Sequence, residues 1–174
     1  MSDDNKAVRR TGLGMMLLFW MLFIGTGTWW FHGYLENQRN PNAHLVNAGN
    51  GVSSVELERN RAGHFMATGH INGEPVEFLL DTGATYVAVS ASLADQLSLE
   101  PTGSAWFNTA NGRVRGDLTT LDEVSLGGFA AREVRGSISP GMEGNVALLG
   151  MSFLNRFDIE IRDARMVLHP ARSD

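Results

Sequence analysis

Asp81 lies in the stretch of this sequence best suited to chemistry. The apolar run Phe78-Leu79-Leu80 ends abruptly at its carboxylate, and Thr82 and Gly83 follow. A carboxyl group at the end of a buried strand is desolvated unless neighbouring groups compensate. Gly83 leaves room for another backbone or a substrate, and its N–H can point back at the carboxylate. We therefore predict that Asp81 is half of a catalytic site. The simpler interpretation is an ordinary turn residue, since Asp, Thr and Gly all favour turns.

Short strands are predicted on both sides of this carboxylate, because the 20 glycines and the Asn-Gly pairs favour many turns. A tight hairpin at Asn72-Gly73 joins strand 64–71 to strand 75–80, which leads straight into Asp81. About 70 residues on, the apolar run 147–150 also ends in glycine and is suited to pack beside the first. The other expected elements are strands 55–59, 86–89, 118–126, 131–138, 157–161 and 166–168, a hairpin over 105–115 and a short helix from Ser90 or Ser92 to about Leu97. The fold class is therefore mainly β.

Three motifs follow one another in a fixed order along the chain. They are Leu79-Leu80-Asp81-Thr82-Gly83-Ala84, a hairpin tipped at Asn111-Gly112, and Leu148-Leu149-Gly150 ahead of Phe153-Leu154. Together they resemble the retropepsin-like aspartic proteases, specifically the bacterial membrane-anchored kind, over roughly residues 59–170. The resemblance implies a closed, barrel-like protomer of short strands with a flap hairpin and one short helix.

The resemblance also implies a role for each motif. Asp81 matches the catalytic aspartate, Thr82 the residue whose hydroxyl braces two loops across a dyad, and Gly83 the close-approach glycine, with Ala84 completing the loop. The flap over the substrate would be the hairpin at Asn111 and Gly112, and the second loop of the site would be Leu148, Leu149 and Gly150. Thr85 stands where many relatives carry Asp or Ser, which leaves substrate main-chain contacts there open.

One carboxylate cannot perform peptide hydrolysis alone. One group must activate water as a general base while another protonates the leaving group, and the two must share a proton at close range. Only Asp81 has an Asp-Thr-Gly or Asp-Ser-Gly setting here, so the second carboxylate would be Asp81 of another copy across a two-fold axis. The expected partners are therefore a second copy of the chain and a peptide or protein substrate.

The segment from Leu13 to Phe31 carries no charge and would span roughly 28 Å as a helix, close to the thickness of a bilayer core. Its basic flank, with Arg9 and Arg10, comes first, which predicts an N-terminus in the cytoplasm and a C-terminal domain across the membrane. The alternatives are a cleaved signal peptide whose apolar core ends near Ile24, or a helix buried in a soluble protein.

These patterns divide the chain into four expected parts. They are a cytoplasmic N-terminus at 1–12, a transmembrane helix at 13–32, a linker at 33–54 rich in Asn, Gln and Gly, and the retropepsin-like domain at 55–174. The expected location is the inner membrane, with the domain outside the cytoplasm; the resemblance to bacterial proteins implies that this compartment is the periplasm.

Several other functions are disfavoured by composition. The net charge of −5 and the scattered arginines disfavour nucleic acid as a partner. The five histidines lack the spacing of a zinc site, cysteine is absent, and Gly150 to Leu154 lacks the second glycine of a nucleophile elbow. We therefore expect no metal and no cofactor. The competing hypothesis is a non-catalytic β-domain that binds peptides or self-associates at the membrane.

Overall fold

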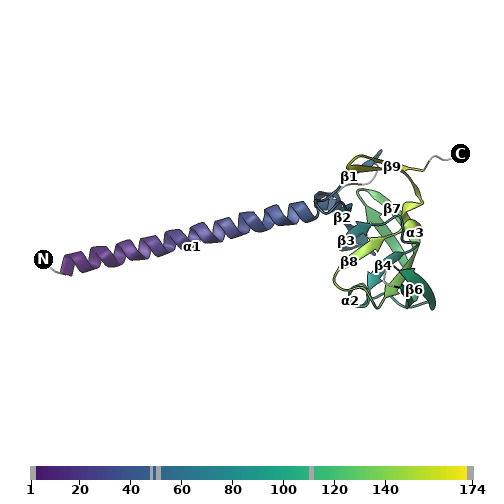
Figure 1. Ribbon diagram of the computed structural model, residues 1–174, viewed down its shortest axis with the longest axis horizontal. Helices are drawn as coiled ribbons and strands as arrows, with labels where there is room; N and C mark the ends of the chain where they lie inside the picture. The colour runs from purple at the N-terminus through teal and green to yellow at the C-terminus, as the bar shows by residue number, and fades with distance from the viewer. Residues whose placement is uncertain (1–2, 48, 50–51, 110–111, 172–174) are drawn as a thin grey trace. The chain divides into compact units, whose positions relative to one another are not determined.

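The computed structural model describes residues 3–47, 49, 52–109 and 112–171. The chain divides into two compact units, with the boundary between Asn37 and Gln38 (Figure 1). The first unit consists of the long helix α1 (Asp3–Arg39), whose last two residues belong to the second unit. Its stretch Gly12–Arg39 is long and apolar enough to cross a membrane, and none of its most apolar part is buried in the protein.

The second unit is mainly β, as predicted. Its sheet of seven strands has the order β2-β3-β8-β4-β7-β6-β5 and is closed on itself by an additional pairing between β2 and β6. The strands of this sheet are β2 (Met66–Ile71), β3 (Glu74–Leu80), β4 (Val87–Ser90), β5 (Gly103–Thr109), β6 (Gly112–Leu126), β7 (Phe129–Ser139) and β8 (Val146–Leu149).

A smaller, three-stranded sheet has the order β1-β10-β9. It is built from β1 (Val55–Glu58), β9 (Phe157–Arg162) and β10 (Arg165–Pro170). Three short helices complete the unit: the 3-10 helix η1 (Ala43–Asn47), α2 (Ala91–Gln96) and α3 (Met151–Leu154). Ser90 caps α2 by accepting a hydrogen bond from the Leu93 N–H at 3.1 Å, which settles the predicted start of that helix.

The core forms between the sheet strands and the short helices. In β3, the alternating residues Val76, Phe78 and Leu80 are buried, as expected for a strand with one face toward the core. β8 pairs with β3 in parallel, with Leu80 opposite Leu149, so the two apolar runs lie side by side as predicted. This pairing brings the ends of both strands to one place.

The hairpin expected over 105–115 and the strand expected over 118–126 share one strand in the structure, the 15-residue β6. Gly116 explains this continuity. A Cβ there would lie 2.8 Å from the Ile138 carbonyl oxygen and 3.1 Å from the Phe107 ring, so glycine allows β6 to pass closely between its neighbours.

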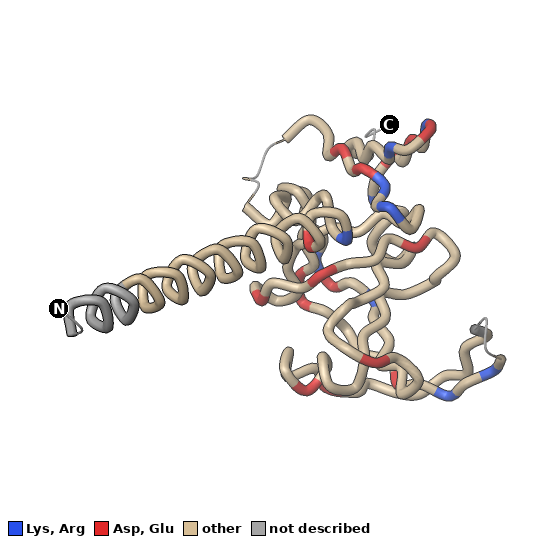
Figure 2. The backbone as a smooth tube through the Cα atoms, turned by 60° about the vertical axis from the view of Figure 1, so that its left-hand side comes forward, with Lys and Arg blue, Asp and Glu red and all other residues tan. Residues whose placement is uncertain are grey.

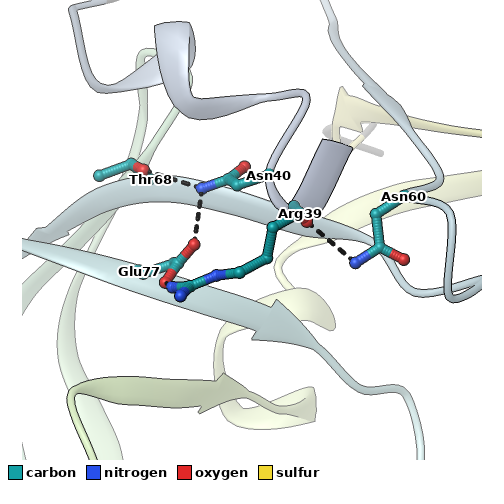
Figure 3. A network of polar contacts seen from close by, with 5 residues as sticks. All are labelled: Arg39, Asn40, Asn60, Thr68 and Glu77. Atoms are coloured by element: carbon teal, nitrogen blue, oxygen red, sulfur yellow. Dashed lines mark hydrogen bonds and ion pairs between the residues drawn. The ribbon is translucent and has the colours of Figure 1, made fainter. Parts of the chain in front are cut away.

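The segment expected to be a linker, residues 33–54, is ordered over much of its length. α1 continues to Arg39, and Asn40 lies against β2 and β3 (Figure 3). Asn42 contacts β1 and β2. The Asn40 amide donates hydrogen bonds to the Thr68 hydroxyl at 3.1 Å and to the Glu77 carboxylate at 3.2 Å, and Arg39 forms an ion pair with Glu77. The second compact unit, residues 38–174, therefore includes part of the segment expected to be a linker.

Charged residues of both signs are scattered over this unit (Figure 2). On the three-stranded sheet, for example, Arg165 lies 2.7 Å from the Glu56 carboxylate and 3.8 Å from that of Glu58. All three of these side chains are more than half exposed, so such pairs contribute little to stability.

Candidate active site

Asp81 begins the loop that follows β3, at the point where the buried strand ends. Its N–H donates to the Leu149 carbonyl at 3.2 Å, and one carboxylate oxygen, Oδ1, accepts the Gly83 N–H at 2.8 Å. The Ala84 N–H donates to the Asp81 carbonyl at 3.2 Å and closes the turn. Asp81 is half-buried in the single protomer. Its carboxylate is therefore less desolvated than the apolar residues that precede it in the sequence predict.

The segment from Leu149 to Ser152 holds this loop through backbone hydrogen bonds. The Met151 N–H donates to the Ala84 carbonyl at 2.8 Å, and the Ser152 N–H donates to the Thr85 carbonyl at 2.9 Å. These bonds satisfy N–H groups in the first turn of α3, which have no partner inside the helix. The predicted second loop, with Leu148, Leu149 and Gly150, thus directly supports the predicted first loop.

Gly150 is required where the two loops cross. A Cβ at this position would lie 2.7 Å from the Ala84 carbonyl oxygen and closer still to that of Tyr86. Real Cβ atoms do not approach backbone atoms so closely, so the crossing needs a residue without a side chain.

Thr82 and Gly83 lie on the open side of the loop, and both are exposed. Among the residues that the structure describes, none forms a hydrogen bond with the Thr82 hydroxyl. The hydroxyl is therefore available to a group from outside the protomer.

The predicted flap corresponds to the hairpin of β5 and β6. Phe107 pairs with Val114, and Trp106 pairs with Arg115, so the two pairs lie on opposite faces of the hairpin. Phe107 contacts the ring of Tyr86, five residues after Asp81, edge to face at a centroid distance of 6.0 Å. Asn111 lies outside the described residues, and Gly112 begins β6 with a φ of 109°.

The opposite face of the hairpin carries Trp106, which is 60% exposed. The Arg113 guanidinium lies over its ring, 5.0 Å from the centroid. Of these two neighbouring aromatic residues, Phe107 is half-buried against Tyr86, whereas Trp106 is exposed.

Two residues of the site were not predicted from the sequence. Tyr86 belongs to the predicted strand 86–89, and no motif in the sequence assigns Ser152 a supporting role. The Ser152 hydroxyl accepts the Val87 N–H at 3.0 Å and donates to the Arg135 carbonyl at 2.7 Å. A serine two residues after Gly150, at the start of a helix, was the available signal, since serine favours helix N-termini.

The described residues contain no group of three or more His, Cys, Asp or Glu residues placed to hold a metal ion. The site itself offers a half-buried carboxylate whose Oδ1 accepts a backbone N–H.

Comparison with known proteins places these features in a family. Residues 67–156, which run from β2 past α3, match the model of the family described as "gag-polyprotein putative aspartyl protease". The fold is similar to the crystal structure of a retropepsin-like aspartic protease from Rickettsia conorii, with 31% identity and a TM-score of 0.57. That similarity covers 68% of this chain and 100% of the Rickettsia chain.

Two curated relatives are similar in sequence, and both are uncharacterized proteins. One, from Sinorhizobium, is 29% identical over 120 residues, covering 67% of this chain and 52% of its own length. The other, from Rickettsia prowazekii, is 28% identical over 109 residues, covering 61% of this chain and 46% of its own length. The chain thus spans about half the length of these relatives. On the family match and the fold, this chain belongs to the retropepsin-like aspartyl proteases.

Proposed function

We propose that this protein is a membrane-anchored aspartic endopeptidase that is active as a homodimer. The observation that carries this proposal is the Asp81 carboxylate. The carboxylate accepts the Gly83 N–H at 2.8 Å. Its loop is held by hydrogen bonds to the Leu149–Ser152 segment, and the neighbouring Thr82 is exposed. The loop is thus supported on one side and open to a partner on the other.

The reaction needs a second carboxylate, and a second copy of the chain supplies it. One Asp81, ionised, accepts a proton from a water molecule whose oxygen attacks the scissile carbonyl carbon. The protonated Asp81 of the other copy donates its proton as the carbon–nitrogen bond breaks, so that water is divided between the two products.

Other residues of the site have supporting roles in this proposal. The exposed Thr82 hydroxyl would brace the two loops across the dimer axis. The face of the β5–β6 hairpin that carries Phe107 and Val114 would cover the substrate, an extended peptide that pairs its backbone with strand edges. No cofactor is required for this chemistry.

The apolar helix would anchor the protein in the inner membrane with its N-terminus in the cytoplasm and the β unit in the periplasm. Confinement to a membrane raises the effective concentration of the protomers, so a weak dimer suffices.

Cleavage of a fluorogenic peptide library by the full chain in detergent, at high protein concentration and across about pH 4 to 7, tests the proposal. We expect cleavage that a pepstatin-type inhibitor blocks. Asp81→Asn should abolish it while leaving the dimer intact, since loss of a charge relieves repulsion at the axis. Asp95→Asn, at an exposed position on α2, is the matched control and should retain activity. Residual cleavage by purified Asp81→Asn protein would refute the assignment. A dimer that binds peptides without cleaving them would instead support the non-catalytic β-domain.

A further inference from the structure

Ser152 connects three segments that are distant in the sequence. Its Oγ accepts the Val87 N–H at 3.0 Å, across 65 residues, and donates to the Arg135 carbonyl at 2.7 Å, across 17 residues. One hydroxyl thereby joins the start of α3, the start of β4 and the strand β7.

These contacts complete the attachment of the Asp81 loop to the Leu149–Ser152 segment. The loop is held at its first residue by Asp81 N–H to Leu149, in its middle by Ala84 and Thr85, and at its end by Val87 N–H to Ser152. The first three attachments use only backbone atoms. The Ser152 hydroxyl is the one side-chain group among these four hydrogen bonds, so it is the one that a substitution can remove selectively.

The place where this hydroxyl acts favours an effect on the site. Val87 is fully buried, and its pairing with Gly136 begins the run of β4 along β7, where the loop returns to the sheet. Tyr86, the residue before it, carries the ring that meets Phe107 of the hairpin. A shift at the Val87 N–H would therefore move both the Asp81 loop and the contact that the hairpin makes with it.

We propose that Ser152 is a positioning residue that holds the Asp81 loop and the Tyr86 ring in the positions that catalysis requires. This inference rests on the proposed peptidase function. Ser152 touches neither Asp81 nor the substrate in this role. It acts through the backbone of Val87, and its loss leaves a buried N–H without a partner.

The test compares Ser152→Thr with Ser152→Val in the full chain in detergent. These two side chains have nearly the same shape and differ in the hydroxyl, so any cost of the extra methyl group is shared. We expect Ser152→Val to lower kcat about tenfold or more relative to Ser152→Thr, with KM changed less than about twofold, because misplacing a catalytic group mainly slows the chemical step.

Ser90→Ala is the control for a purely structural effect. The Ser90 hydroxyl also accepts a backbone N–H, that of Leu93 at 3.1 Å, and also donates to a carbonyl, that of Gly144 at 2.7 Å. We expect this variant to lower the melting temperature without lowering kcat at permissive temperature. If Ser152→Val and Ser90→Ala lose activity only in proportion to their loss of stability, Ser152 is structural and the proposal is wrong.

Hydrogen exchange provides a readout that needs no activity. In Ser152→Val, the amides of residues 82–87 should exchange faster than in Ser152→Thr, while exchange in β1, β9 and β10 stays unchanged. Equal exchange of the loop in the two variants would overturn the proposal. If the wild-type chain cleaves no peptide, the proposed function fails, and the exchange experiment still decides the role of Ser152.

Discussion

Gly150 lies under the Asp81 loop at a crossing where there is no space for one more carbon atom. Its neighbours there are the carbonyl oxygens of Ala84 and Tyr86, and both belong to backbone that cannot move aside without shifting the loop. The same backbone also receives the hydrogen bond from the Met151 N–H. Stability and loop geometry are therefore linked at this residue.

Gly150→Ala should destabilise the protein by about 1–3 kcal/mol or more, as overpacking of a closely fitted site does. Urea unfolding measures this, and peptide cleavage under native conditions should fall as well. Gly141→Ala is the matched control, because a Cβ there meets nothing within 4 Å. Equal unfolding midpoints for the two variants would contradict the close crossing.

Asp81, Gly83 and Gly150 could be predicted from the sequence because each belongs to a short motif read along the chain. Ser152 could not, because its hydroxyl acts on Val87 and Arg135, which only the fold brings to it. Long-range hydrogen bonds of a single hydroxyl leave no periodicity or spacing to detect.

Asn42 shows how a polar segment becomes part of a folded unit. Its side-chain amide donates to the carbonyls of Glu58 at 2.9 Å and Met66 at 2.7 Å, and its Oδ1 accepts the Glu58 N–H at 2.8 Å. Asn42 is 1% exposed and its backbone bridges Ala67. The amide therefore connects β1, in the smaller sheet, to β2, in the larger one.

Asn42→Ala should lower the free energy of unfolding by about 3 kcal/mol or more, since buried partners are left unsatisfied at a cost of about 1–3 kcal/mol each. Asn42→Asp should be at least as harmful, because the oxygen that replaces the amide nitrogen faces the two carbonyls and cannot donate to them. Thermal and urea unfolding of the full chain measure both variants. Asn47→Ala, at an exposed position in η1, should be neutral. Similar stability of the Asn42 and Asn47 variants would show that the bridge contributes little.

The composition of residues 33–54 predicted a linker because asparagine and glycine favour turns and offer no apolar periodicity. What the composition cannot show is that an asparagine amide carries the same donor and acceptor as a peptide group and can take its place between strands. Strands such as β3, by contrast, were predictable because their burial alternates along the chain.

The contacts of Asn40 and Asn42 set the limits of the folded unit. A fragment of residues 38–174 keeps the hydrogen bonds of Asn40 and Asn42, whereas a fragment of residues 55–174 loses them. We expect the shorter fragment to unfold at a clearly lower urea concentration, as measured by circular dichroism. Equal midpoints would show that residues 38–54 are dispensable for the fold.

The proposed dimer makes activity depend on how closely the protomers are held. If each site needs Asp81 from two copies, the specific activity of the fragment 38–174 should rise with its concentration and reach a plateau once the dimer predominates. The full chain, reconstituted in lipid vesicles at the same bulk concentration, should already be near that plateau, because the membrane concentrates its protomers. Mixing wild-type chains with an excess of Asp81→Asn chains should reduce wild-type cleavage, since mixed dimers hold only one carboxylate able to ionise. Specific activity that stays constant on dilution of the fragment, with no inhibition by the inactive chains, would mean that a single protomer carries the whole site.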